Sequence, residues 1–134
     1  MFSGIDKELV PIFWSEVSRM LGKVLKRDPG RDDLDNIYDS LLGGVIQLWC
    51  GFEGDTIEIV VLTKIVYCAK KKILRVLMLS GSKLYKYIEN LDIIMEWGTK
   101  NECASIEFTG RKGFRKILRH LNFKETLIFY EAPL

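Results

Sequence analysis

Histidine is almost absent from this chain of 134 residues, because His120 is the only one. Metal sites built from several histidines are therefore excluded, and a Ser-His-Asp or Cys-His triad would have to use His120. No pattern typical of a nucleophile elbow lies near His120. The sequence predicts no metal site and no catalytic triad.

Cysteine is also scarce, with Cys50, Cys68 and Cys103 as the only three. Their number is odd and no pair has the spacing of metal ligands, whereas a secreted disulfide framework normally uses an even number. Each cysteine lies in or beside an apolar segment. We therefore predict buried, reduced thiols and a reducing compartment.

Long apolar runs are missing as well, since Glu58, Lys64 or Arg75 interrupts the longest ones. The sequence predicts no membrane span and no membrane partner. Residues 1–8 lack a basic region followed by an apolar core, so we expect no signal peptide. The net charge of +2 and pI of about 8.4 give no overall electrostatic indication of nucleic-acid binding.

The composition that remains is typical of a globular protein, with 48% hydrophobic and 28% charged residues. A chain of 134 residues has the size of one domain, and neither a repeat nor a low-complexity linker divides it. We expect a single domain over residues 1–134.

Hydrophobic periodicity predicts two helices in the first third of the chain. Apolar residues recur in steps of three and four over Val10–Leu25, where Pro11 suits the first turn. Asp32 and Asp33 favour the start of a second helix, which ends at Gly43-Gly44.

The rest of the chain reads as a meander followed by alternating helices and strands. Strands rich in β-branched residues are predicted over Val45–Phe52, Thr56–Tyr67 and Ile73–Leu79. They are followed by a helix over Lys83–Trp97 with Gly98 as its cap, a strand over Cys103–Thr109, a helix over Arg111–Leu121 that ends at a left-handed Asn122, and a strand over Glu125–Glu131. The spacing predicts that the strands before and after the Lys83–Trp97 helix are parallel neighbours.

The last helix carries five cations on its outer surface. They are Arg111, Lys112, Arg115, Lys116 and Arg119. A nucleic-acid contact is one interpretation, but no aromatic residues are interleaved among the charges. A solvated amphipathic face explains the pattern more simply.

This order of elements resembles the GNAT (Gcn5-related N-acetyltransferase) fold. The segment Gly110–Phe123 looks like the family's Asn-x-x-(Ala/Ser)-x-x-Leu-(Tyr/Leu)-x-x-x-Gly-Phe stretch. Glu96-Trp97-Gly98 and Gly110–Phe114 are most similar to small GNAT-like proteins encoded with tailed-phage virion genes. The resemblance implies an α/β (α+β) domain whose central mixed sheet is mostly antiparallel, with two helices before the meander and two in the C-terminal half.

The resemblance also implies where acetyl-CoA would bind. The family holds the pyrophosphate of the cofactor on backbone amides of a glycine-rich loop at the start of a helix. The corresponding residues here are Leu79, Ser80, Gly81, Ser82 and Lys83, with Arg111 at the position of a CoA-contacting Asn. The loop is shortened, and an ordinary helix cap would use the same residues.

Catalytic residues of the family have no clear counterparts. Leu118 stands where a Tyr often acts as general acid, so Tyr85, Tyr87 or Tyr130 would have to replace it. Glu53 and Glu58 are the only carboxylates on the meander that could serve as a general base. We therefore assign no catalytic residue.

Two functional hypotheses follow. The first is a catalytically degenerate GNAT-fold phage protein that acts through binding, as a virion or assembly component, with other virion proteins or itself as partner. It would be found in the cytoplasm of the infected bacterial host or in the virion. The alternative is an active acetyl-CoA-dependent N-acyltransferase with a shortened pyrophosphate loop, in which catalysis is mostly positioning. In the family, the two parallel strands separate to admit CoA. If bulky residues such as Leu79 and Phe114 fill that space, the first hypothesis is favoured over the alternative.

Overall fold

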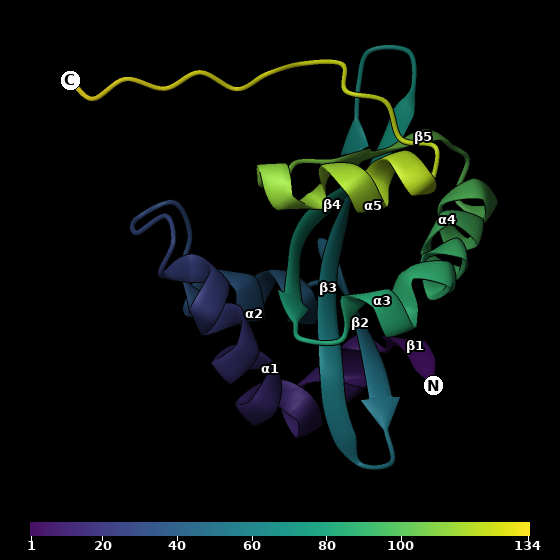
Figure 1. Ribbon diagram of the computed structural model, residues 1–134. Coiled ribbons are helices and arrows are strands. Elements are labelled where there is room, and N and C mark those ends of the chain that lie inside the picture. The colour runs from purple at the N-terminus through teal and green to yellow at the C-terminus, as the bar shows by residue number, and fades with distance from the viewer.

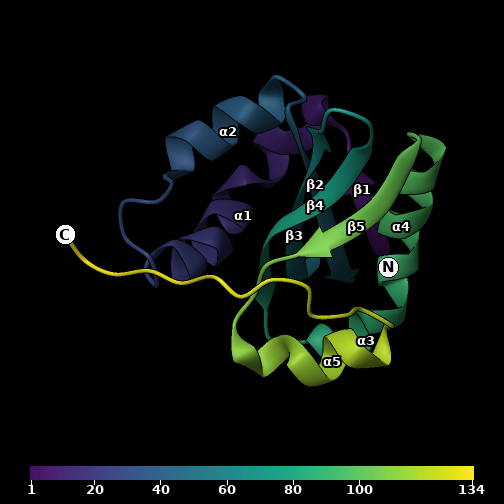
Figure 2. The ribbon, with the colours of Figure 1, turned by 90° about the horizontal axis from the view of Figure 1, so that it is seen from above.

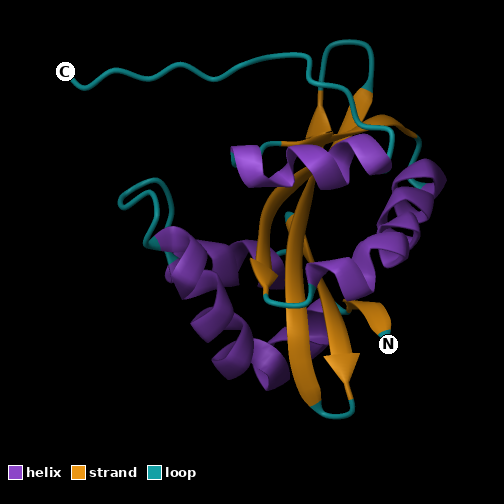
Figure 3. Ribbon diagram, in the orientation of Figure 1, coloured by secondary structure: helices purple, strands orange, loops and turns teal.

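The computed structural model describes residues 1–134 as a five-stranded sheet with helices on both faces (Figures 1 and 3). The strands are β1 (Phe2–Ile5), β2 (Ile46–Glu53), β3 (Thr56–Tyr67), β4 (Lys72–Gly81) and β5 (Cys103–Phe108), and they lie in that order across the sheet. The pairs from β1 to β4 are antiparallel, and β4 and β5 are parallel. The expected mixed, mostly antiparallel sheet is confirmed.

The helices are α1 (Val10–Leu25), α2 (Leu34–Leu42), α3 (Leu84–Tyr87), α4 (Leu91–Lys100) and α5 (Arg115–His120). Figure 2 shows α1 and α2 on one side of the sheet and α3, α4 and α5 on the other. Asp33 caps α2, because its carboxylate accepts a hydrogen bond of 2.8 Å from the backbone N–H of Asn36. None of these helices is both long enough and apolar enough to cross a bilayer.

Strand β3 lies at the centre of two cores because its side chains alternate between the faces of the sheet. Val60 and Leu62 pack with the buried residues of α1 and α2. Ile59 and Val61 pack on the opposite side, together with Ile94 of α4. All four of these β3 residues are at most 1% exposed. The alternation places a hydrophobic core under the helices on each face of the sheet.

Several sequence predictions for the second half were wrong in detail. The helix predicted over Lys83–Trp97 is broken into α3, a 3-10 turn at Ile88–Asn90 and α4. Gly98 does not end it, since α4 continues to Lys100. A Cβ atom on Gly98 would lie 2.8 Å from Leu74, so this glycine makes room for helix-to-sheet packing.

The strand predicted over Glu125–Glu131 is not formed, and β1 was not predicted. Residues 124–134 are exposed and belong to no strand, as Figure 3 shows. A β-rich sequence forms a strand only where a partner edge is within reach, which local pattern does not reveal. Asn122, in contrast, has the predicted left-handed backbone, with φ of 66°.

The cysteines do not all meet the prediction of buried thiols. Cys50 is fully buried and Cys103 partly so, but Cys68 is exposed in the turn before β4. Burial raises the pKa of the Cys50 thiol to about 12. Cys50 is therefore protonated at neutral pH.

Candidate functional site

Strands β4 and β5 separate at a bulge in β4. Leu62 of β3 faces Met78 and Thr63 faces Val76, so Leu77 is an extra residue on β4. Such an insertion bends the strand that carries it. Pairing with β5 ends at Val76 and Phe108, whereas β4 continues beside β3 as far as Gly81. The last residues of β4 therefore have no β5 partner.

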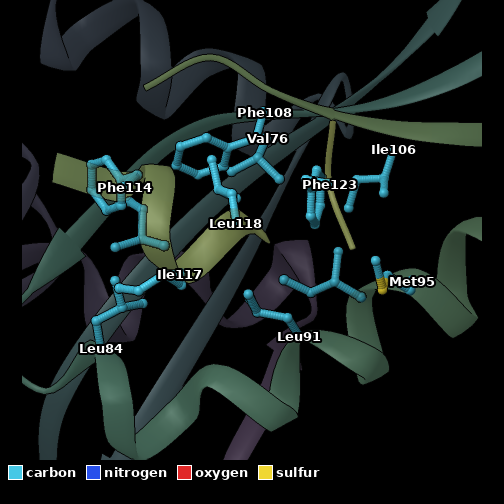
Figure 4. A pocket seen from close by; sticks show the side chains of 12 residues that line it. Val76, Leu84, Leu91, Met95, Ile106, Phe108, Phe114, Ile117, Leu118 and Phe123 are labelled. Carbon is cyan, nitrogen blue, oxygen red and sulfur yellow. The ribbon is translucent and has the colours of Figure 1, made fainter. Parts of the chain in front are cut away.

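Hydrophobic side chains fill the space between the separated strands. The rings of Phe108 and Phe114 meet edge to face with their centroids 5.2 Å apart. Figure 4 shows Leu118 of α5 and Leu91 of α4 directed into the same space. All twelve lining residues are hydrophobic, and the remaining cavity is about 20 Å³. That volume holds about one water molecule. We call this space the apolar cavity.

A larger polar pocket of about 400 Å³ lies beside the end of β4. Its charged lining residues are Arg19, Lys23 and Arg27 from the α1 region, Glu58 of β3, and Arg111. The turn Ser80–Ser82 lines it as well, and we call it the β4-end pocket. Leu79, Leu84 and Phe114 line both spaces and so form the wall between them.

The β4-end pocket brings together most of the residues that the sequence assigned to a cofactor site. Leu79, Ser80, Gly81, Ser82 and Arg111 all line it. Lys83 does not, and its Nζ lies 3.7 Å from Oε2 of Glu58. The six residues thus lie in one region. Five of them line the pocket, and Lys83 forms an ion pair with a sixth lining residue, Glu58.

The local geometry differs from that of a glycine-rich phosphate loop. The hydroxyl of Ser80 is buried and donates a 2.7 Å hydrogen bond to the carbonyl of Met20, so it ties β4 to α1. Gly81 has φ of 147°, and a Cβ atom there would lie 2.3 Å from the carbonyl oxygen of Glu58. Close packing of β3 and β4 therefore requires this glycine. The following helix, α3, has only four residues, so its dipole is small.

The sequence analysis missed the cations of the α1 region. Arg19 and Lys23 are four residues apart on one side of α1, and Arg27 lies in the turn just after the end of that helix. The spacing of four residues is visible in the sequence, beside the apolar stripe that predicts the helix. With Arg111, they give the pocket four cations against the single carboxylate of Glu58.

Glu58 lies at the centre of a polar cluster at the edge of the buried core. Its Oε1 accepts hydrogen bonds of 2.7 Å from Lys86 Nζ and 2.7 Å from the Tyr87 hydroxyl. The side chain of Glu58 is 11% exposed and Tyr87 is 2% exposed. Lys86 also donates to Glu53 at 2.5 Å. Lys83 and Lys86 together offset the charges of Glu58 and Glu53, and Glu16 offsets that of Arg19. Three cations of the pocket, Lys23, Arg27 and Arg111, therefore remain without a carboxylate partner.

The same contacts fix the protonation of the cluster. Hydrogen bonds from Lys86 and then Tyr87 hold the pKa of Glu58 below its usual value. Burial, and then the hydrogen bond to Glu58, raises the pKa of Tyr87. Glu58 is therefore a weak base and Tyr87 a weak acid, and the hydroxyl proton of Tyr87 is donated to the Glu58 carboxylate. Tyr85 and Tyr130 are exposed, at 75% and 85%.

We expect Glu58→Gln to flatten the acid side of the stability profile. A carboxylate whose pKa is depressed in the folded state stabilises the protein above its unfolded pKa, near 4.5, and this contribution is lost as the pH falls through the folded value. The measurement is the melting temperature between pH 3 and pH 7. Glu16→Gln serves as control, because Glu16 is 43% exposed in its pair with Arg19. Parallel profiles of wild type and Glu58→Gln would contradict the assignment.

The basic surface of the last helix is exposed, as expected. Arg111, Lys112, Arg115, Lys116 and Arg119 are all exposed. Arg115 pairs with Glu125, and only Arg111 reaches the β4-end pocket. Leu118, at the position of the family's Tyr, lines the apolar cavity. It contributes packing where the family places an acid.

Comparison with solved structures identifies the fold. A mutant of the BH1408 protein from Bacillus halodurans is 12% identical, with a TM-score of 0.73, over 100% of this chain and 99% of that one. An aminoglycoside acetyltransferase from an uncultured soil metagenomic sample, in complex with sisomicin, is 10% identical with a TM-score of 0.72, over 100% and 95%. A predicted acetyltransferase from Clostridium acetobutylicum, solved with acetyl-CoA, is 12% identical with a TM-score of 0.72, over 99% and 95%.

The chain therefore has the GNAT fold, which acetyltransferases share. Its sequence matches no protein-family model, and no curated protein is significantly similar to it. At identities of 10 to 12%, these structures establish the architecture only. What the site does must be argued from its own residues.

Acetyl-CoA fits this site only in part. The cations of the β4-end pocket suit its phosphates. Its long pantetheine arm, however, has no room between β4 and β5, where the cavity is about 20 Å³. The residues present therefore do not accommodate the whole cofactor in this conformation.

Proposed function

We propose that the protein binds a phosphate-bearing ligand in the β4-end pocket and does not transfer an acetyl group from CoA. The filled space between β4 and β5 carries this proposal, because acetyl transfer requires the thioester arm to reach the acceptor. The absence of an acid at Leu118 and the mutual engagement of Glu58 and Tyr87 support it.

The ligand class follows from the pocket's charge and size. A volume of about 400 Å³ lies within the roughly 300 to 1,000 Å³ that is usual for small-molecule sites. Lys23, Arg27 and Arg111 offer several N–H donors to phosphate oxygens, and guanidinium groups match phosphate geometry. Arg19 also lines the pocket, but its guanidinium is paired with Glu16. Ser82 adds a hydroxyl that is free of hydrogen bonds within the protein.

Ligand-dependent melting tests the proposal. We expect acetyl-CoA and its nucleotide fragment, 3′-phosphoadenosine 5′-diphosphate, to raise the melting temperature equally, because only the phosphates find partners. At ten times the dissociation constant, the folded state gains about 1.4 kcal/mol, or roughly 5 °C for a domain of this size. A much larger effect of acetyl-CoA, or release of free CoA in the presence of amines, would show that the arm binds productively.

The second candidate is an acetyl-CoA-dependent N-acyltransferase. It is favoured by the position of the β4-end pocket at the separated strands, and by the likeness to a protein solved with acetyl-CoA. It requires α5 to move, because Phe114 and Leu118 occupy the space that the arm would need. The melting comparison above separates the two candidates.

We also infer that the binding activity serves a phage particle or its assembly. The likeness of Glu96-Trp97-Gly98 and Gly110–Phe114 to GNAT-like proteins of tailed phages supports this part of the proposal. The partners would be other virion proteins or a second copy of the chain. Mass spectrometry of purified particles from the encoding phage would detect the protein if it is a virion component.

A further inference from the structure

Two segments of the chain contain cations and no carboxylates. Residues 17–27 cover most of α1 and the turn after it, and residues 108–124 contain α5. Together they hold ten of the 20 lysines and arginines and none of the 18 carboxylates, so the rest of the chain has a net charge of −8. All ten of these cations are exposed. The small net charge of +2 therefore results from a strong separation of charge within the molecule.

The fold brings the two segments together at the β4-end pocket. Lys23 and Arg27 from the first segment and Arg111 from the second line the same pocket. Figure 1 shows α5 and the end of α1 around the end of β4. A single basic helix is explained by solvation, but solvation does not explain why two basic segments that are distant in the sequence meet at one cavity.

The positive charge continues from the pocket along α5. Phe114, Ile117 and Leu118 face the apolar cavity, so the positions between them face outward. Three cations on this outer side have no carboxylate partner, and together with the three unpaired cations of the pocket they form what we call the basic surface. Its residues are Lys23, Arg27, Arg111, Lys112, Lys116 and Arg119.

The carboxylates near the basic surface are engaged elsewhere. Glu16 pairs with Arg19, and Glu125 pairs with Arg115. Glu58 is held by Lys83 and Lys86. The six cations therefore remain available to an anionic partner.

The pocket also has an apolar part, which narrows the class of partner. Six of its fifteen lining residues are hydrophobic, and they are Met20, Val24, Ile57, Leu79, Leu84 and Phe114. A nucleotide matches this combination, because it joins a charged phosphate to a base with an apolar face. In a duplex the bases are stacked and paired, whereas in a single strand a base is free to enter a pocket.

We propose that the basic surface binds single-stranded nucleic acid, with one nucleotide in the β4-end pocket and the neighbouring phosphates along α5. This inference rests on the proposed phosphate site and extends it from a small ligand to a polymer. The unpaired cations contact the phosphates, and the apolar part of the pocket contacts a base.

Fluorescence anisotropy with a labelled oligothymidine of twelve nucleotides tests the proposal. Engagement of about five phosphates gives a slope of about −3.5 in log K against log salt, which is roughly a tenfold loss of affinity for each doubling of the salt concentration. A duplex of the same length should bind more weakly than the single strand. Equal or tighter binding of the duplex, or equal binding of polyglutamate, would overturn the assignment to single strands.

Charge reversal on α5 separates this proposal from the proposed function. Lys116→Glu together with Arg119→Glu should weaken binding of the oligothymidine by about tenfold or more, because two phosphate contacts are lost. The same variant should keep its affinity for inorganic pyrophosphate within a few-fold, since neither residue lines the pocket. The matched control is Lys70→Glu together with Lys71→Glu, in the turn at the far end of β4, which should change neither affinity more than a few-fold.

Each remaining outcome has a definite meaning. Pyrophosphate binding without oligothymidine binding would overturn the present inference and leave the proposed function intact. Equal losses in the α5 and turn variants would show that net charge alone attracts the polymer. Oligothymidine binding that survives Lys23→Glu with Arg27→Glu would show that the polymer does not use the pocket. All the substituted side chains are exposed, so these variants should keep the fold.

Discussion

Gly81→Ala is expected to destabilise the protein by about 3 kcal/mol or more, and to lower its melting temperature by roughly 10 °C. The backbone at Gly81 has φ of 147°, where side chains are strained, and the new Cβ would lie 2.3 Å from the carbonyl oxygen of Glu58. That oxygen belongs to the paired strand β3, so it cannot move without disturbing the sheet.

Gly22→Ala provides the control for this substitution. Gly22 lies within α1, and a Cβ there would have no atom within 4 Å. We expect it to stabilise the protein by about 0.5 to 1 kcal/mol, because alanine is the better helix former. Chemical denaturation measures both changes. If Gly81→Ala were as well tolerated as Gly22→Ala, the close approach of β3 and β4 at Gly81 would be wrong.

The second large effect concerns ligand binding. We expect Lys23→Glu together with Arg27→Glu to weaken binding of inorganic pyrophosphate by about 100-fold or more, since two charge-assisted contacts are replaced by repulsion. Calorimetric titration at low salt measures the affinity, and rising ionic strength should weaken wild-type binding.

Lys116→Glu together with Arg119→Glu is the matched control for the pocket. It makes the same change in net charge, but both residues lie on the exposed face of α5 outside the pocket. We expect its affinity for pyrophosphate to change only a few-fold, through the long-range field. An equal loss in both double variants would mean that net charge, and not the β4-end pocket, attracts the ligand.

The sequence predicted the elements well where a local pattern determines them. The helix over Val10–Leu25 and the strand over Thr56–Tyr67 have the predicted limits, because periodicity and β-branched composition are local properties. The C-terminal residues 124–134 show the converse. Their apolar side chains predicted a strand, but a strand needs a partner, and that depends on contacts far along the chain.

The candidate site was predictable only in part for a similar reason. The resemblance located the end of β4 and Arg111, which do line one pocket. The filling of the apolar cavity depends on side chains from β4, β5 and three helices, so no spacing along the sequence could reveal its volume. The sequence assigned Gly81 to a cofactor-binding loop, whereas the structure shows that close packing of β3 and β4 requires this glycine.

The most direct test of the account is a methyl and amide NMR titration with acetyl-CoA. We expect saturable shifts at the amides of Gly81 and Ser82, and unchanged methyl signals for Ile106 and Leu118 in the apolar cavity. The same pattern is expected with 3′-phosphoadenosine 5′-diphosphate. Large shifts of the Ile106 and Leu118 methyls with acetyl-CoA alone would show that the thioester arm enters between β4 and β5, and would contradict the proposal of binding without acetyl transfer.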